Sequence, residues 1–247
     1  LFPHNPEHAS PYSPSSRLFF NILYLDVEAI TDFHECEAAR ALLRTPEFQM
    51  RLEGLRATDL VDYAGVAALK LPMLEMLYRF FCERHLAAGS ERATAFRAFQ
   101  AREGERLYRH TLFEALQEHF HNQDPNIWGW PAWPEPYRHP ESTEVREFET
   151  QYRDRIEFFA YLQWQADLQL AAAGWRSLEL GLGVGLYLDL AISVDGGGAE
   201  AWANQALYAI GVGVGAPPEL NNQLGQDWGL PPFVPDRLRE TAYAPFI

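Results

Sequence analysis

The segment Gly185-Leu186-Tyr187-Leu188-Asp189-Leu190-Ala191-Ile192 decides the fold class, because it is the clearest candidate for a β-strand in the chain. Its apolar run is nearly continuous, which is typical of strands that are buried in parallel sheets. Asp189 interrupts the run near its carboxyl end, where enzymes built on closed parallel sheets hold their catalytic and binding groups. The segment therefore predicts a buried parallel strand that ends close to a carboxylate.

The chain before this segment divides into extended, irregular and helical stretches. Residues 18–27 are rich in β-forming side chains and are predicted to be extended, whereas residues 1–17 are rich in Pro and Ser and should be irregular. Helix patterns and their stop signals predict helices over residues 33–44, 46–55, 59–87 with a break or kink at Pro72, 91–102 and 105–120.

The strongest helical pattern begins at Ser142-Thr143-Glu144 and continues to about residue 170. Its apolar residues recur at intervals of three and four, which places them on one helix face: Val145, Phe148, Tyr152, Ile156, Phe159, Leu162, Ala166 and Leu170. Residues 128–137, just before it, combine tryptophans with prolines and should form no regular element. Tryptophans held in such a loop are expected to line a pocket or a contact surface rather than a core.

These elements favour an α/β fold in which extended segments flank a helical block. The block is much longer than the 2–6 residues that usually connect a strand to a helix. A complete (β/α)8 barrel needs eight strand–helix units, and the chain does not supply them. We therefore expect part of a (β/α)8 TIM barrel with a large, mainly helical insertion. Residues 1–30 and 142–247 would be barrel segments, and residues 31–141 would form the insertion subdomain.

Composition restricts the class of partner and the compartment. The formal net charge of -14 disfavours nucleic acid, anionic membranes and polyanionic substrates, while a neutral substrate is not penalised. The chain has no basic leader followed by an apolar stretch, and its longest apolar run, residues 181–194, is shorter than a membrane helix. Cys36 and Cys82 lack metal-ligand spacing and are interpreted as free thiols in a reducing compartment, although a single disulfide stays open.

Several motifs that suggest other chemistries lack the context that those chemistries require. The glycines of residues 181–185 and 211–215 neither open a helix after a strand nor precede a Lys-Ser or Lys-Thr pair, so they indicate flexible backbone rather than a nucleotide site. His119 and His121 do not have zinc spacing and are interpreted as surface residues that cap a helix. No Gly-x-Ser-x-Gly elbow is present. These motifs therefore indicate no nucleotide site, no zinc site and no serine nucleophile.

Asp189 is the carboxylate that stands out, and its role stays open between function and structure. A carboxylate buried without partners is costly, so a strand-end Asp must bind a substrate or bond to backbone amides. Glycosidic chemistry with retention needs two carboxyl groups about 5–5.5 Å apart. Asp195 lies nearby, but Asp195-Gly196-Gly197-Gly198 is typical of a turn, so the residues provide no convincing second carboxyl group.

An ordered series of motifs resembles the 4-alpha-glucanotransferase family (amylomaltase, or disproportionating enzyme), in its longer bacterial branch. The series begins with Ser10-Pro11-Tyr12-Ser13-Pro14-Ser15-Ser16-Arg17 and ends with Gly225-Gln226-Asp227-Trp228-Gly229-Leu230-Pro231-Pro232. Between them lie Asn21 with residues 25–29, 61–63 with 66–70, 128–135, 161–164, 185–187 with 189–191, 197–202, and 215–218. One such motif would be weak, but the ordered set spans nearly the whole chain.

The resemblance implies a (β/α)8 barrel enzyme of carbohydrate metabolism that transfers segments between α-1,4-glucans by a retaining double displacement. Maltodextrins, as they arise from glycogen or starch, would be its substrates, no cofactor would be needed, and the enzyme would be cytoplasmic. The resemblance also places a substrate loop within residues 1–30 and a loop that covers the cleft at residues 211–235. It assigns substrate contacts to Ser10, Tyr12, Asn21, Asp189, Pro217, Pro218, Gln226 and Trp228.

The chain departs from the family at several positions. Leu188 stands where the family usually has Arg, Ser193 where Gly is common, and Glu219 where Asp is common. The loss of Arg at residue 188 would remove a charge partner of Asp189. The family's nucleophile lies in an Arg-Ile-Asp-His motif and its acid/base in a Gly-Glu-Asp-Leu-Gly motif, and neither occurs in these 247 residues. We therefore expect no catalytic residue in this chain, with Asp189 in a supporting role.

Three other interpretations of the sequence stay open. An α-glucan hydrolase of a related barrel family would use water as its acceptor and would release glucose and shorter chains without any longer ones. A non-catalytic glucan-binding module would be retained on amylose and perform no chemistry. A role in protein interaction remains for the aromatic residues 128–137. The sequence does not indicate the oligomeric state.

Overall fold

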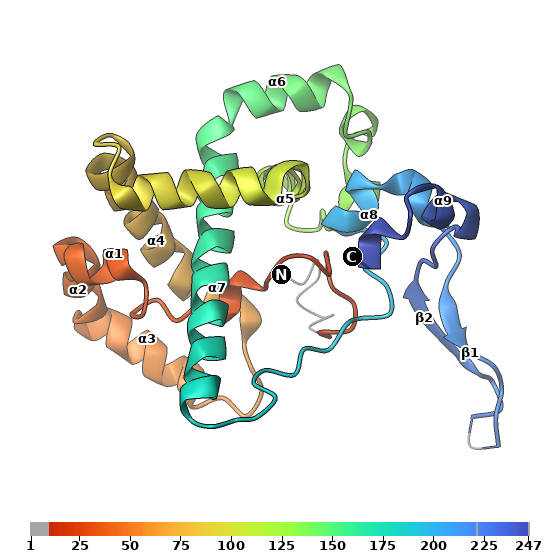
Figure 1. Ribbon diagram of the computed structural model, residues 1–247, viewed down its shortest axis with the longest axis horizontal. Helices are drawn as coiled ribbons and strands as arrows, with labels where there is room; N and C mark the ends of the chain where they lie inside the picture. Colours follow the sequence, from red (N-terminus) through yellow and green to blue (C-terminus); the bar gives the residue numbers. More distant parts are fainter. Residues whose placement is uncertain (1–9, 221, 247) are drawn as a thin grey trace. The chain divides into compact units, whose positions relative to one another are not determined.

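The computed structural model describes residues 10–220 and 222–246 (Figure 1), and the chain divides into two compact units. Unit 1 comprises Leu1–Phe19, Arg109–Arg153 and Asp189–Ile247, and unit 2 comprises Phe20–Tyr108 and Asp154–Leu188. Both units are mainly helical. The sheet of the described residues consists of two strands. Of the helices in the described ranges, none combines the length and the apolar character that crossing a bilayer requires.

Unit 2 is built from short helices that lead into long ones. Its elements are η1 (Ile22–Tyr24), α1 (Thr31–Glu35), α2 (Glu37–Leu43), α3 (Pro46–Arg56), α4 (Tyr63–Phe81), a π-helical turn (Cys82–Leu86), the first part of α5 (Glu91–Gln123) and nearly all of α7 (Arg153–Glu179). Thr45 accepts a hydrogen bond from Phe48 N and caps α3, whose first residue is Pro46. Asp62 caps α4 in the same way, through Gly65 N.

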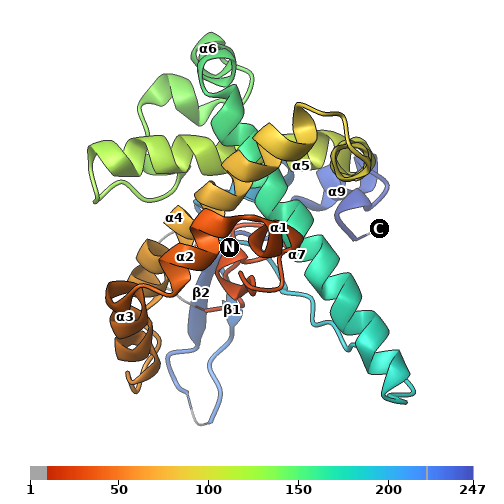
Figure 2. The same cartoon turned by 90° about the vertical axis from the view of Figure 1, so that its left-hand side faces the viewer.

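The core of unit 2 includes the place where α4 and α7 cross (Figure 2), and there Tyr78 and Phe81 of α4 contact aromatic rings of α7. Phe81, Phe96, Tyr161 and Trp164 form a cluster of tilted and edge-to-face rings, with centroid separations of 5.2 to 6.4 Å. Such pairs add to the stabilisation that burial of their apolar area provides. These four aromatic residues therefore serve packing.

A buried ion pair joins three elements of unit 2. Asp32 of α1 accepts hydrogen bonds at 2.7 Å from Arg92 of α5 and from the hydroxyl of Tyr161 of α7. The guanidinium of Arg92 lies over the rings of Phe81 and Trp164. Because an unpaired buried carboxylate is costly, these contacts explain how Asp32 is accommodated in the interior.

Unit 1 combines the second part of α5 with short elements and a hairpin. These are η3 (Trp130–Ala132), η4 (Glu135–Arg138), α6 (Thr143–Gln151), α8 (Ala199–Ala203), η5 (Gln205–Leu207), β1 (Val214–Ala216), β2 (Gln226–Leu230), α9 (Pro235–Glu240) and η6 (Ala244–Phe246). The expected break between residues 102 and 105 is found at Gly104, whose φ of 57° and ψ of -137° are not helical. The long helix expected from residue 143 is interrupted at Tyr152, between α6 and α7.

Two of the three tryptophans of the Pro-rich segment, Trp130 and Trp133, are core residues, so the expectation that they line a pocket or a contact surface is wrong for these two, whereas Trp128 is half-buried. Trp133 is 0% exposed, and its ring packs against those of Phe113, Phe120 and Trp202. The indole N–H of Trp133 donates to Gln117 Oε1, and that of Trp130 donates to the carbonyl of Gly196. Two short 3-10 turns, η3 and η4, accommodate the prolines while the rings are buried.

Both predictions of strand in the barrel segments are also wrong in this structure. Residues 18–27 contain the 3-10 turn η1, and residues 185–192 form neither a strand nor a helix. The side chains of the second stretch are exposed: Tyr187 is 92% exposed and Asp189 is also exposed. An extended run becomes a buried strand only where neighbouring strands satisfy its N–H and C=O groups. The described residues place no such neighbours beside it.

Glu114 of α5 is a carboxyl group buried in unit 1. Its Oε1 has no hydrogen-bond partner among the described residues. Burial, with a smaller contribution from the nearby Glu118, raises the pKa of Glu114 to about 7. The folded protein therefore holds a proton on this group at pH values where the unfolded chain has lost it.

Replacing Glu114 with Gln should flatten the dependence of stability on pH. For this group, stability is highest below the unfolded pKa of 4.5 and falls as the pH rises to about 7. The free energy of unfolding should fall by at most ~1.4 kcal/mol per pH unit in that interval. Urea unfolding of the wild type and of Glu114→Gln at several pH values measures the difference. Glu147→Gln, an exposed change on α6, is the control. An unchanged slope in Glu114→Gln would contradict the prediction.

Candidate functional site

The loop Ser10–Arg17 presents one aromatic side chain to solvent while its second half is buried. The hydroxyl oxygen of Ser10 accepts a hydrogen bond from Tyr12 N at 3.3 Å, and the carbonyl of Ser10 accepts from Ser13 N at 3.2 Å. This turn leaves Tyr12 60% exposed, whereas Ser15 and Ser16 are buried. The buried half of the loop is therefore held in place, while Tyr12 is accessible to a ligand.

Helix α8 holds the buried half of this loop through hydrogen bonds to Ser15. Ser15 Oγ accepts a hydrogen bond from Ala199 N at 2.9 Å, and the carbonyl of Ser15 accepts from Glu200 N, also at 2.9 Å. A Cβ atom at Gly198 would lie 2.8 Å from Ser15 Cα, so this close approach requires glycine. The Gly-rich turn before α8 thus allows the loop backbone to lie directly on the helix.

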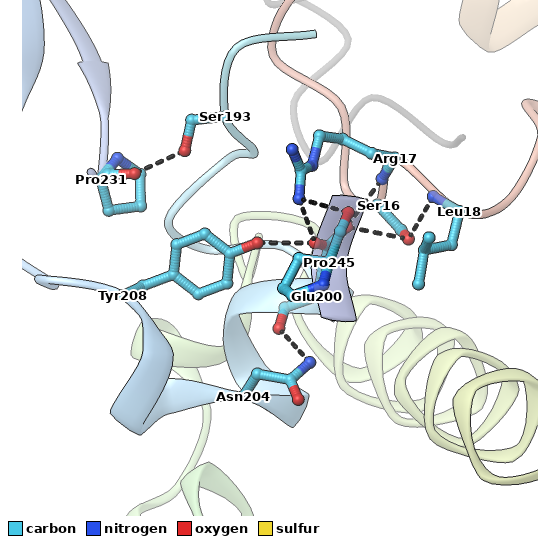
Figure 3. A network of polar contacts seen from close by, with 9 residues as sticks. All are labelled: Ser16, Arg17, Leu18, Ser193, Glu200, Asn204, Tyr208, Pro231 and Pro245. Atoms are coloured by element: carbon cyan, nitrogen blue, oxygen red, sulfur yellow. Dashed lines mark hydrogen bonds and ion pairs between the residues drawn. The ribbon is translucent and has the colours of Figure 1, made fainter. Parts of the chain in front are cut away.

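Glu200 of α8 is the centre of a buried polar network (Figure 3). Its carboxylate accepts hydrogen bonds from Arg17 N at 2.8 Å, Arg17 Nη2 at 3.2 Å, Ser16 Oγ at 3.3 Å and Tyr208 OH at 2.6 Å. Burial raises the pKa of Tyr208, and the neighbouring Glu200 raises it further, so the phenol stays protonated and donates. These contacts satisfy a carboxylate that would otherwise be costly to bury.

Strands β1 and β2 form the antiparallel hairpin that corresponds to the cleft-covering loop expected at residues 211–235. Val214 pairs with Leu230, Gly215 with Asp227 and Ala216 with Gln226, with an irregularity between Val214 and Gly215. Pro217 and Pro218 follow β1 directly and are exposed. The strand pairing therefore holds a projecting element whose far end is open to solvent.

Gln226 and Trp228 lie two residues apart on β2 and point to the same face of the hairpin. The indole N–H of Trp228 donates to Gln226 Oε1 at 2.8 Å, and the indole is 44% exposed. Ser193, where the family commonly has Gly, donates its hydroxyl proton to the carbonyl of Pro231 just beyond β2. The hairpin thus presents an aromatic ring whose orientation is fixed by its neighbour.

The remaining candidate residues are placed differently. Asn21 belongs to unit 2, where its side chain accepts a hydrogen bond from Leu23 N and caps η1. Asp189 begins the third segment of unit 1 and is exposed, and no hydrogen bond of its carboxylate is found within the described part of the chain. Ser10, Tyr12, Pro217, Pro218, Gln226 and Trp228 all lie in unit 1.

His119 and His121 of α5 pack against aromatic rings. His119 contacts the rings of Phe148 and Tyr152, and burial lowers its pKa. The ring of His121 lies 4.1 Å from that of Trp128, centroid to centroid. Their interpretation as surface caps therefore needs correction. Across residues 10–220 and 222–246, no three His, Cys, Asp or Glu side chains are grouped to hold a metal ion.

Comparison with known proteins assigns the family. The family model described as 4-alpha-glucanotransferase matches residues 1–247, the whole chain. The chain belongs to the 4-alpha-glucanotransferase family.

The sequences of two relatives in this family align with nearly the entire chain. The 4-alpha-glucanotransferase of Haemophilus influenzae is 35% identical over 249 residues and that of Mycobacterium tuberculosis 38% over 242, which cover 100% and 98% of this chain. The alignments cover 36% and 31% of those proteins, so the chain spans about a third of their length.

Solved structures of amylomaltases share the fold. The crystal structure of amylomaltase from Corynebacterium glutamicum superposes with a TM-score of 0.74 at 32% identity, covering 96% of this chain and 30% of that one. Amylomaltase from Streptococcus agalactiae in complex with acarbose gives a TM-score of 0.72 at 22% identity, covering 95% and 45%. The second likeness is evidence for the fold alone.

The polar network around Glu200 was not singled out from the sequence, although it lies within motifs shared with the 4-alpha-glucanotransferase family. Arg17 is the last residue of one motif, and Glu200 lies in the first turn of α8 within another motif. The two residues are 183 positions apart in the sequence. The signal that could have indicated Glu200 is its position as an acidic residue in the otherwise apolar helix Ala199–Ala203. The motifs therefore carry structural residues as well as the residues that are candidates for substrate contact.

Replacing Gly215 with Ala should disrupt the hairpin. A Cβ atom at Gly215 would lie 1.9 Å from the carbonyl oxygen of Gln226, a distance that requires the backbone to shift. Amide hydrogen exchange in residues 226–230 should become about tenfold faster or more, since loss of about 1.4 kcal/mol of local stability has this effect. Gly54→Ala in α3 has open space around its Cβ and is the control. Equal exchange in the two variants would rule out the predicted clash.

Proposed function

We propose that this chain is the part of a 4-alpha-glucanotransferase that holds an α-1,4-glucan beside the reacting bond. The observation that carries the proposal is the pair of Gln226 and Trp228 on β2. A half-exposed indole, oriented by the hydrogen bond from its N–H, provides an apolar face next to amide groups. Sugar-binding sites combine an aromatic surface with a few placed polar groups.

The loop Ser10–Arg17, also in unit 1, supports the same role. Tyr12 offers an exposed ring and a hydroxyl group, and Ser10 lies within the same turn. The formal charge of -14 does not oppose a neutral maltooligosaccharide. Ser10, Tyr12, Asn21, Asp189, Pro217, Pro218, Gln226 and Trp228 are proposed as substrate contacts, and no catalytic residue, metal or cofactor is assigned to this chain.

The finer architecture belongs to this proposal. We assign residues 1–30 and 142–247 to a (β/α)8 barrel and residues 31–141 to a helical insertion. The exposed apolar run at residues 185–192 supports the assignment, because in such a barrel these side chains would be covered by neighbouring strands. The two free cysteines, Cys36 and Cys82, support a cytoplasmic location.

The reaction type is tested with a complete enzyme that carries this segment, incubated with maltotriose. Transfer predicts glucose together with maltooligosaccharides longer than maltotriose. A hydrolase would release glucose and maltose without longer products, and a glucan-binding module would give no product at all. The 247-residue chain alone should give none; longer products from it would place the catalytic carboxylates within this chain.

Replacing Trp228 with Ala should weaken binding of maltoheptaose to the chain by about tenfold or more, since removing a central aromatic contact commonly has such an effect. Tyr12→Ala should also reduce the affinity. Isothermal titration calorimetry measures the dissociation constants. Trp175→Ala is the matched control, because Trp175 lies in unit 2 on α7 and is also exposed. Unchanged affinity in both Trp228→Ala and Tyr12→Ala would remove the basis of the site assignment.

Replacing Asp189 with Asn in a complete enzyme tests the supporting role of this carboxylate. We expect the transfer rate to fall on the order of 100-fold, as happens when a group that stabilises the reacting centre is removed. The quantity to measure is kcat/KM for maltotriose. Wild-type values would make Asp189 a structural residue, whatever the result at Trp228.

A further inference from the structure

Arg17 connects the two segments that carry the candidate glucan contacts. It ends the loop that contains Tyr12, and its backbone N–H and its Nη2 both donate to Glu200. Its guanidinium carbon lies 4.9 Å from the ring centroid of Phe233 and 5.0 Å from that of Phe246. Nη2 also reaches the carbonyl oxygen of Pro245 at 3.5 Å. One side chain thus contacts segments that are far apart in the sequence.

The contact between Arg17 and Phe233 lies at the stem of the hairpin, where residues 207–209 pair with residues 232–234. Tyr208 forms an antiparallel bridge with Phe233, Ala209 N donates to the carbonyl of Pro232, and Val234 N donates to the carbonyl of Leu207. The rings of Tyr208 and Phe233 are 4.7 Å apart, and the Tyr208 hydroxyl donates to Glu200 (Figure 3). The stem leads directly into β1 and β2, so a shift of Phe233 would be transmitted to Trp228.

The free-energy cost of burying Arg17 indicates that this residue does more than stabilise the interior. Its side chain is 1% exposed, yet its Nε and Nη1 have no hydrogen-bond partner among the described residues. Buried ion pairs gain little over well-packed apolar residues of similar size, and unpartnered N–H groups reduce the gain further. What the guanidinium provides is geometry, because its planar group lies over two adjacent rings, whose centroids are 5.3 Å apart, while it bonds to a carboxylate in a fixed direction.

We propose that Arg17 is a positioning residue that sets the spacing between the Tyr12 loop and the β1–β2 hairpin, so that both contact the same glucan. The identity of the ligand as a glucan rests on the proposed function. Arg17 acts through Glu200, Phe233 and Tyr208 and does not itself contact the glucan.

Unit 2 supplies a matched control for this network. Arg92 pairs with the buried Asp32, Tyr161 donates its hydroxyl to the same carboxylate, and the guanidinium lies over the rings of Phe81 and Trp164. Arg92→Met therefore removes the same kind of interaction as Arg17→Met, at a place that holds neither the loop nor the hairpin. The comparison separates loss of position from general loss of stability.

The spacing itself is measured between spin labels at Tyr12→Cys and Leu224→Cys, which are both exposed positions of unit 1, in a chain with Cys36 and Cys82 replaced by Ala. Double electron–electron resonance should give a narrow distance distribution that becomes roughly twofold wider with Arg17→Met, since a site whose supporting residues are lost becomes loose by an ångström or more. Arg17→Lys, which keeps the charge and loses the stacking, should be intermediate. Tyr208→Phe provides a milder variant should Arg17→Met fail to fold.

Binding of maltoheptaose completes the test. In the chain with native Tyr12 and Leu224, Arg17→Met should weaken binding about tenfold and Arg92→Met should leave it unchanged. An unchanged distance distribution in Arg17→Met, or in Tyr208→Phe where the first variant is unfolded, overturns the inference, as does equal broadening by Arg92→Met. A broader distribution with unaltered affinity also overturns it. If the unmodified chain binds no glucan while Arg17→Met broadens the distribution, the proposed function fails and the positioning role of Arg17 stands.

Discussion

Each compact unit buries a carboxylate that is paired with an arginine, Asp32 in unit 2 and Glu200 in unit 1, and acidic residues are almost never fully buried unless they are paired. Asp32 and Glu200 each accept from an arginine and from a tyrosine hydroxyl, and each arginine lies over two aromatic rings. A carboxylate left in such a site without its donors would cost several kcal/mol. The arginine and the tyrosine must therefore reach the carboxylate when the surrounding elements pack, which ties those elements together within each unit.

The helices were the part of the fold that local sequence could predict. Thr45-Pro46 indicates the start of α3 through capping, and Gly104 lies at the expected break. The helix expected from residue 59 begins instead at Tyr63, after the cap Asp62, and contains Pro72. The strand at residues 185–192 could not be judged locally, because an apolar run becomes a strand only when partners complete its hydrogen bonds. The burial of Trp130 and Trp133 was likewise hidden, since their partners Gly196 and Gln117 are set by tertiary packing.

The candidate site was predictable to the extent that its residues belong to ordered family motifs. Tyr12, Gln226 and Trp228 follow from such motifs, and the structure adds that Gln226 orients the indole. No pattern within a few residues could have joined Arg17 to Glu200, because the two residues are 183 positions apart and meet only when the chain folds. Side chains that face a ligand can be found by resemblance, whereas those that set the distance between ligand-facing segments require coordinates.

The hydrogen bond between the Trp228 indole and Gln226 has a consequence for the thermodynamics of association. A free surface tryptophan would lose rotational freedom when a ligand stacks on it, and immobilising such a side chain costs about 0.5–1.5 kcal/mol. Because the N–H of Trp228 is already engaged at 2.8 Å, its rotamer is selected before any ligand arrives. The ring is preorganised, and a larger share of the contact energy remains available as affinity.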